Sequence, residues 1–257
     1  YVKDLQPEIE AEMKEVDSAL SPFNKQSIIT AINNNQKTSL NKKFTEVFNL
    51  AEKISRETDG AFDITVAPLV NEWGFGFKKG VDPSKHAIDS LRQIVGYQKV
   101  ALKDGKIVKQ DPRINLDCSG VAKGYGSDCV ANLLRRHGIE NFMVEIGGEV
   151  VTSGINPDRV PWRIGVTKPV DDPTLQGGEL QTVLNVTDKA MATSGNYRNF
   201  YYKGGKKYAH TIDPKTGYPV QHNILSSTVV ADNCATADAY ATAFMVMGLE
   251  KAKAILD

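Results

Sequence analysis

A succession of short strand-like segments in the second half of the chain constrains the fold more than any other feature. These segments are rich in β-branched and aromatic residues, and turn residues such as Gly, Asn and Asp separate them. They span residues 142–146, 150–153, 162–167, 180–186, 190–193, 199–202, 207–211 and 225–231. Helical patterns precede and follow this run, which favours an α+β fold over a βαβ fold. We therefore predict an antiparallel β-sheet core with flanking helices.

Helical periodicity marks segments on both sides of the strands, where apolar residues recur at steps of three and four. The predicted helices span residues 5–20, 43–56, 82–94, 119–137, 236–247 and 249–256. Residues 100–108 are predicted to form a hairpin around Asp104-Gly105, and residues 63–66 are predicted to be a short extended piece.

The composition indicates a folded globular chain and excludes some classes of partner. With 257 residues, of which 41% are hydrophobic, the chain can form one large domain or two small ones. Lys plus Arg and Asp plus Glu both number 31, so no basic excess argues for nucleic acid. The three cysteines, Cys118, Cys129 and Cys234, lack zinc-site spacing and do not decide the redox compartment.

The chain carries no sign of membrane insertion. No apolar run approaches the roughly 18 residues that a membrane-spanning helix needs. The sequence starts directly in polar residues, without a signal peptide. A processed exported protein would look the same, so this start does not indicate the cytoplasm.

Asp238 and Thr242 form the most informative polar pair. A four-residue spacing places both side chains on one helical face, and their oxygens suit a hard cation such as Mg²⁺. Magnesium sites of this kind usually also hold substrate phosphates. The surrounding helix is rich in Ala, Met and Val, so it looks buried, and a buried Asp needs a partner. The alternative is an Asp near a helix start and a Thr that bonds back to a carbonyl.

His210 stands just before a turn with the sequence DPKTG at residues 213–217. A histidine near a metal-phosphate site can take a proton from a nucleophile, whereas the alternative is an ordinary core histidine in a hairpin.

The small residues SGVAKGYG at 119–126 open a predicted helix, whose start can attract phosphate. Close helix packing explains those small residues equally well.

Five segments together resemble the ApbE family, the FAD:protein FMN transferases. They occur in the family's order and cover most of the chain. The segments are GAFDITVAPLV at 60–70 with WGFG at 73–76, the stretch 117–125, EIGGE at 145–149, TSGNY at 193–197, and HTIDPKTG at 210–217 followed by ADAYATA at 237–243.

The resemblance implies an enzyme that binds FAD and Mg²⁺ and cleaves the pyrophosphate. It would move FMN onto a threonine or serine hydroxyl of an acceptor flavoprotein and release AMP. Asp238 and Thr242 would be Mg²⁺ ligands, with a backbone carbonyl of the loop at Gly120 as the third. His210 would transfer the proton. The implied FAD contacts are Phe23, Asp63, Lys123 and Ile212.

The resemblance also carries expectations about the whole protein. One flavin-transferase domain is expected over residues 1–257, and truncation at both ends is left open because the family's opening Met-Gly-Thr strand is not recognisable before Lys3. An exported, periplasmic or cell-envelope lipoprotein is expected, with membrane contact only through a lipid anchor absent from this chain. Two rival functions stay open: a Mg²⁺-dependent FAD pyrophosphatase and a flavin-binding protein without turnover.

Overall fold

The computed structural model describes residues 3–77, 83–170, 179–197 and 199–256. Its helices are α1 (Gln6–Leu20), α2 (Ile28–Asn33), α3 (Lys42–Glu57), α4 (Ala67–Glu72), α5 (Lys85–Arg92), the 3₁₀ helix η1 (Tyr97–Lys99), α6 (Ala122–Arg136), α7 (Cys234–Met247) and α8 (Leu249–Leu256). Its strands are β1 (Val100–Lys103), β2 (Lys106–Lys109), β3 (Phe142–Ile146), β4 (Glu149–Ser153), β5 (Trp162–Thr167), β6 (Leu180–Val186), β7 (Ala190–Gly195), β8 (Phe200–Lys203), β9 (Lys206–Ala209) and β10 (Ser226–Ala231).

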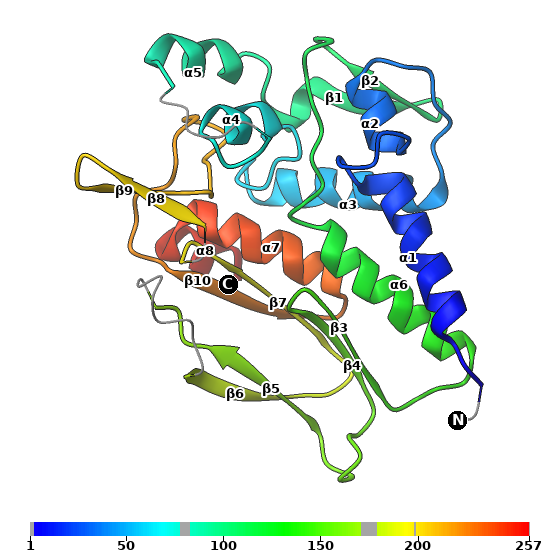
Figure 1. The fold of residues 1–257 in the computed structure, drawn as a ribbon. Helices are drawn as coiled ribbons and strands as arrows, with labels where there is room; N and C mark the ends of the chain where they lie inside the picture. Colours follow the sequence, from blue (N-terminus) through cyan, green and yellow to red (C-terminus); the bar gives the residue numbers. More distant parts are fainter. Residues whose placement is uncertain (1–2, 78–82, 171–178, 198, 257) are drawn as a thin grey trace.

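The central sheet is antiparallel and has the strand order β10-β7-β4-β3. Helices α6 and α7 lie side by side across one face of it, with α1 and α3 beyond them (Figure 1). The hairpin β5–β6 covers part of the other face, where its Ile164 and Val166 pack against Val150 and Met191 of the sheet. The predicted α+β class, with an antiparallel core and flanking helices, is therefore confirmed.

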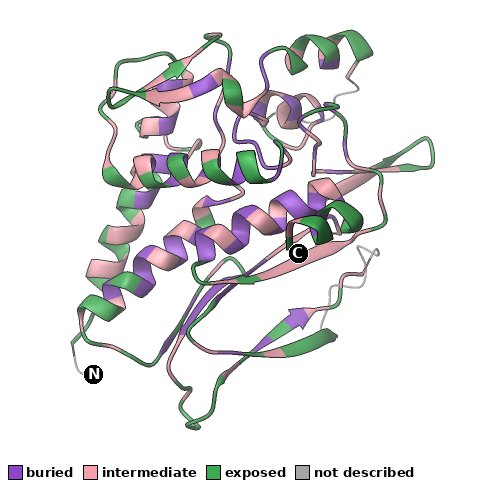
Figure 2. Ribbon diagram, turned by 180° about the vertical axis from the view of Figure 1, so that it is seen from behind, coloured by how far each residue is buried: buried purple, intermediate pink, exposed green. Residues whose placement is uncertain are grey.

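Helix α7 is buried along almost its whole length (Figure 2). Its first turn is capped twice. The side chain of Asn233 accepts a hydrogen bond from the N–H of Thr236, and the carboxylate of Asp128 on α6 accepts from the N–H groups of Cys234 and Ala235, both at 2.8 Å. A carboxylate at this end satisfies unpaired N–H groups and complements the helix dipole. These bonds fix the start of α7 against α6.

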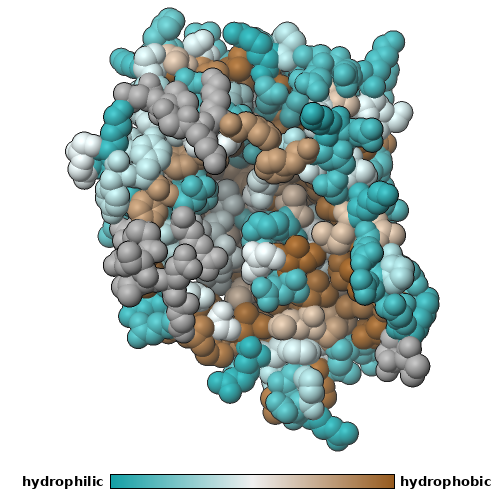
Figure 3. Space-filling model, in the orientation of Figure 1, coloured by the Kyte–Doolittle hydropathy of each residue, from teal (hydrophilic) through white to brown (hydrophobic). Residues whose placement is uncertain are grey.

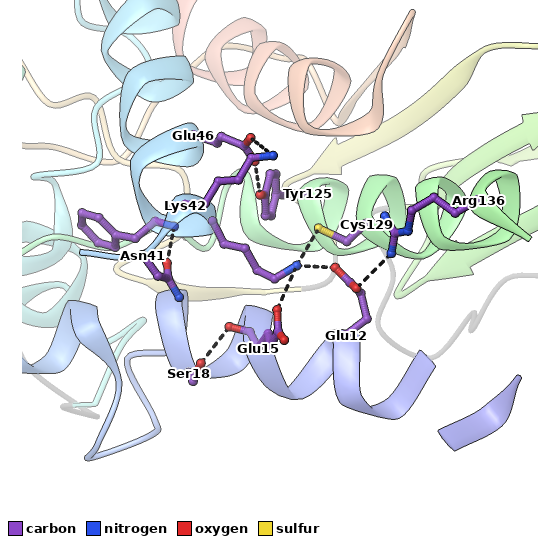
Figure 4. A network of polar contacts seen from close by, with 11 residues as sticks. Glu12, Glu15, Ser18, Asn41, Lys42, Glu46, Tyr125, Cys129 and Arg136 are labelled. Atoms are coloured by element: carbon purple, nitrogen blue, oxygen red, sulfur yellow. Dashed lines mark hydrogen bonds and ion pairs between the residues drawn. The ribbon is translucent and has the colours of Figure 1, made fainter. Parts of the chain in front are cut away.

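A polar network ties α6 to α1 and α3 (Figure 4). Lys43 of α3 forms ion pairs with Glu12 and, at 3.6 Å, with Glu15 of α1, and Arg136 of α6 lies 3.4 Å from Glu12. Burial by itself would lower the pKa of Lys43, but the hydrogen bond with Glu12 and the nearby negative charges outweigh it and the pKa is raised. The network thus holds Lys43 charged and keeps the three helices in register.

Most predicted elements are confirmed. The strands at 142–146, 162–167 and 180–186 and the helix at 249–256 have the predicted bounds, and the hairpin at 100–108 forms with Asp104 and Gly105 at positive φ. The helix predicted at 82–94 spans Lys85–Arg92, and Asp82 lies outside the described residues. Within the described part of the chain, no helix is both long and apolar enough to cross a bilayer.

The extended piece predicted at residues 63–66 is wrong. The carboxylate of Asp63 accepts hydrogen bonds from the N–H and the hydroxyl of Thr65, at 2.8 and 2.6 Å, which closes a turn. Helix α4 follows at once, with Pro68 in its first turn, where a missing N–H costs nothing. The β-branched residues suggested a strand, but the Asp side chain competed with the backbone pairing that a strand needs.

Candidate active site

A cavity of about 390 Å³ opens where the loop before α6, the last two turns of α7, the end of β7 and the segment after β9 meet. The face of the molecule drawn in Figure 3 is hollowed near its centre. All but one of the predicted site residues line the cavity, although they come from four separate parts of the chain. They are Asp63, Gly120, Lys123, His210, Ile212, Asp238 and Thr242.

Asp238 is held in the wall of the cavity by the contact between α6 and α7. Its side chain is only 3% exposed, and its Oδ2 accepts a hydrogen bond of 3.1 Å from the N–H of Gly124. A side chain at Gly124 would collide with the carbonyl of Cys234, because a Cβ there would lie 2.4 Å from that oxygen. The absence of a side chain therefore lets the two helices approach closely enough for this hydrogen bond.

Thr242 lies one turn further along α7 and faces the loop before α6. A Cβ at Gly120 would lie 3.1 Å from the Thr242 hydroxyl oxygen and 3.2 Å from the ring of Phe62, so this backbone approaches Thr242 closely. The hydroxyl of Thr242 is also 3.1 Å from that of Ser194 on β7. The predicted metal ligands Gly120, Asp238 and Thr242 are thus brought to one place.

Glu149 is a second buried carboxylate in the cavity, and the sequence prediction gave it no role. It begins β4, is 2% exposed, and forms an ion pair of 2.5 Å between its Oε1 and Lys123 Nζ. Its Oε2 is buried and has no hydrogen-bond partner among the described residues. The segment EIGGE pointed to this region of the chain, but no local pattern indicated that its last residue would meet Lys123.

The surroundings of the two buried carboxylates disfavour their ionisation. Burial, together with the negative charge of Glu149, raises the pKa of Asp238 to about 7. Burial also raises the pKa of Glu149, against the opposing effect of Lys123. Two buried acids with one lysine between them leave negative charge that a cation would neutralise.

The donor set fits a hard cation. In the described residues, no three His, Cys, Asp or Glu side chains gather into a metal-binding group. The predicted set instead combines the carboxylate of Asp238, the hydroxyl of Thr242 and a backbone carbonyl. Such all-oxygen sites with few carboxylates are typical of Mg²⁺ that shares its coordination with phosphates and water.

His210 follows β9 and lines the same cavity. Its Nδ1 lies 3.3 Å from the carbonyl oxygen of Asn199. Because a carbonyl can only accept, Nδ1 carries the proton in this contact, and the neutral ring keeps a lone pair on Nε2. Burial lowers the pKa of His210 below 6.5, against the effect of that hydrogen bond, so the neutral base is favoured near pH 7.

Asp63 and Ile212 line the cavity but have structural contacts as well. Besides Thr65, the Asp63 carboxylate accepts a hydrogen bond of 2.7 Å from the N–H of Tyr97, so little of its bonding capacity is left. Ile212 is buried and pairs with Pro219 across the DPKTG turn, which is closed by Gly217 at φ +78°. Their contacts with FAD stay predictions.

Phe23 is the predicted site residue that does not line the cavity. Its side chain is 76% exposed in the loop after α1, and its ring centroid lies 5.3 Å from that of Phe77. The structure therefore does not bring Phe23 together with the other seven residues. Its contact with FAD also stays a prediction.

Comparison with known proteins identifies the family. The model described as the ApbE family matches residues 1–257. The chain belongs to the ApbE family. A Vibrio cholerae protein named FAD:protein FMN transferase is 38% identical over 260 aligned residues, covering 99% of this chain and 77% of that protein. An Escherichia coli protein of the same name is 35% identical over 262 aligned residues, covering 98% of this chain and 74% of that protein.

Solved structures of ApbE proteins have the same fold. The flavin transferase ApbE from Vibrio cholerae superposes with a TM-score of 0.89 at 37% identity, covering 99% of this chain and 82% of that chain. The apo form of the Pseudomonas stutzeri flavinyl transferase ApbE gives a TM-score of 0.86 at 31% identity, covering 98% and 78%. The family resemblance of the five motifs is thus confirmed.

The raised pKa of Asp238 makes a prediction about stability. Between the ordinary value of 3.8 and about 7, the folded ApbE chain binds a proton that the unfolded chain releases. The free energy of unfolding should therefore fall as the pH rises through this window. Asp238→Asn removes the buried charge, and its amide oxygen can still accept from Gly124. We expect it to be more stable than the wild type at pH 8, by up to a few kcal/mol.

The measurement is urea unfolding in EDTA at pH 5 and pH 8. The stabilisation should shrink at pH 5, where the wild-type side chain is protonated. Asp158→Asn, on an exposed loop, is the matched control and should be neutral at both pH values. Equal stability of Asp238→Asn and wild type at pH 8 would contradict the buried-charge assignment.

Proposed function

We propose that this chain is an FAD:protein FMN transferase that acts with Mg²⁺. The observation that carries the proposal is the convergence of Asp238, Thr242 and Gly120 beside Lys123 in one cavity. Membership of a family whose relatives bear this name supports it. The acceptor atom would be a threonine or serine hydroxyl of a flavoprotein, and AMP would be released.

The metal-binding and charge-neutralising groups have separate tasks. Asp238, Thr242 and the backbone at Gly120 would hold Mg²⁺, which when bound would offset negative charge on the FAD pyrophosphate. Lys123 would bind a phosphate oxygen, and its ion pair with Glu149 orients the ammonium along the cavity wall. Because Glu149 is buried and fixed, it positions Lys123 at little entropic cost.

His210 supplies the base in this proposal. The acceptor oxygen would attack the phosphorus of the FMN half, its O–P bond would form, and the bond to the AMP oxygen would break. The proton of the attacking hydroxyl would pass to Nε2 of His210, which the contact between Nδ1 and Asn199 leaves unprotonated.

The partners of the proposed enzyme are FAD and an acceptor flavoprotein. The balanced charge of the chain, 31 basic and 31 acidic residues, gives no support to a nucleic-acid partner. From the family resemblance, we propose an exported, periplasmic or cell-envelope location.

The proposed activity is tested by following AMP and FMN together. The wild-type chain is incubated with FAD, Mg²⁺ and a library of synthetic peptides that each hold one central threonine among randomised neighbours. We expect fast AMP release only when peptides are present, with an equal amount of FMN attached to threonine. AMP release at the same rate without peptide, with free FMN as the product, would mean a pyrophosphatase. FAD binding with no AMP at all would mean a flavin-binding protein.

His210→Asn tests the assignment of the base. We expect FMN transfer to fall by about 10²-fold or more, the usual size of a lost general base, while FAD affinity stays within a few-fold. His86→Asn, on the exposed face of α5, is the control and should transfer at the wild-type rate. An unchanged transfer rate together with a collapse of FAD affinity would make His210 a binding residue instead.

A further inference from the structure

A second cavity joins the first at the turn between β3 and β4. It measures about 620 Å³ and lies between the sheet and strand β5 of the hairpin. Gly147, Thr193 and Tyr197 line both cavities. The two cavities are therefore adjacent, and Gly147, which has no side chain, lies where they meet.

The second cavity follows the edge of a strand. All five residues from Arg163 to Thr167 line it, although side chains of successive strand residues point to opposite faces. Its long wall is thus the backbone edge of β5. Among the described strands, β5 pairs only with β6, so this edge has free N–H and C=O groups. A free edge of this kind can accept an extended polypeptide by main-chain hydrogen bonds.

The walls carry two charges without partners. Glu145 lies on β3 and Arg163 on β5. Both are exposed, and neither side chain forms a hydrogen bond or ion pair with another described residue. The buried apolar residues Val150, Ile164 and Met191 lie beneath the groove, and most of its exposed lining is polar. A polar groove with one acid and one base on its walls suits a polypeptide segment, whereas Glu145 would repel the phosphates of a nucleotide.

The inner end of this groove holds an unsatisfied acceptor. Oε2 of Glu149 lies 3.6 Å from the place that a Cβ on Gly147 would occupy, so it stands beside the junction of the two cavities. It is buried without a hydrogen-bond partner in the described structure. A buried acceptor of this kind costs free energy as long as no donor reaches it.

We propose that the groove lined by Met143, Glu145, Gly147 and residues 163–167 binds the target segment of the acceptor protein in an extended conformation. The segment adds to the edge of β5, its neighbouring side chains meet Glu145 and Arg163, and its threonine or serine passes Gly147 toward the first cavity. This inference rests on the proposed transferase function and names the surface by which the second substrate is recognised.

The test uses the same library of one-threonine peptides and reads which peptides receive FMN. With the wild type, we expect the peptide positions that occupy the groove to be enriched in acidic residues where they meet Arg163 and in basic residues where they meet Glu145. Arg163→Glu should lower kcat/KM for the wild-type-preferred peptides by about tenfold and replace the acidic preference with a basic one. Glu145→Lys should reverse the other preference.

FAD affinity should stay at the wild-type value in both variants, because neither side chain lines the first cavity. Lys103→Glu, an equal charge reversal on the distant β1–β2 hairpin, should change neither rate nor preference. A merely misfolded variant would lose FAD binding and would not invert a sequence preference.

Two results would overturn the inference and leave the transferase function intact. One is that Arg163→Glu and Glu145→Lys keep the peptide preferences of the wild type. The other is that the wild type is a dimer and Arg163→Glu is a monomer. The dimer result would make the groove an interface between copies. Failure of the wild type to label any hydroxyl, in the library or in intact flavoproteins, would instead remove the transferase function and the groove with it.

Discussion

The close contact between α6 and α7 at Gly124 is the constraint on which the site depends. No side chain fits there, since a Cβ would lie 2.4 Å from the carbonyl of Cys234. The approach lets Asp128 cap α7 and lets the Gly124 N–H reach Asp238. The remaining network, through Lys43, Glu12 and Arg136, fixes α6 against α1 and α3. Helices α6 and α7 therefore form the base of the cavity, and their contacts with the rest of the fold fix their positions.

The site buries two acids whose charge the proposed cation would offset. Asp238 and Glu149 are almost completely buried, and the negative charge of Glu149 disfavours ionisation of Asp238. Lys123 compensates only part of this charge, since its side chain is half exposed and pairs with one oxygen of Glu149. Burying acids without full compensation costs stability, and proteins retain such arrangements mainly where function requires them. This cost supports the proposal that metal and phosphate bind in this cavity and not in the larger groove beside it.

Much of the fold could be predicted because its elements have strong local signals. The alternating strand at 142–146, the Asp104-Gly105 turn and the apolar run of α7 each specify their own conformation. Asp238 and Thr242 could be placed on one helical face because their four-residue spacing is itself a local signal.

The turn at Asp63 was missed because a side-chain hydrogen bond outweighed the β propensity of this segment. Glu149 was missed because its partner Lys123 is 26 residues away and meets it only when β4 packs beside α6. Phe23 carried no local signal at all, and its exposed position depends on the loop after α1.

The proposed metal site depends above all on the α6–α7 contact. The most direct measurement is a Mg²⁺ titration followed by thermal unfolding at pH 8, comparing Gly124→Ala with Gly126→Ala. The Cβ added at Gly126 would meet side chains, the flexible end of Met13 at 3.3 Å and Ile146 Cδ1 at 3.7 Å, whereas the one at Gly124 would meet backbone. We expect Gly126→Ala to be stabilised by Mg²⁺ like the wild type, and Gly124→Ala to need about tenfold more Mg²⁺ or not to respond. A wild-type Mg²⁺ response in folded Gly124→Ala would contradict the account.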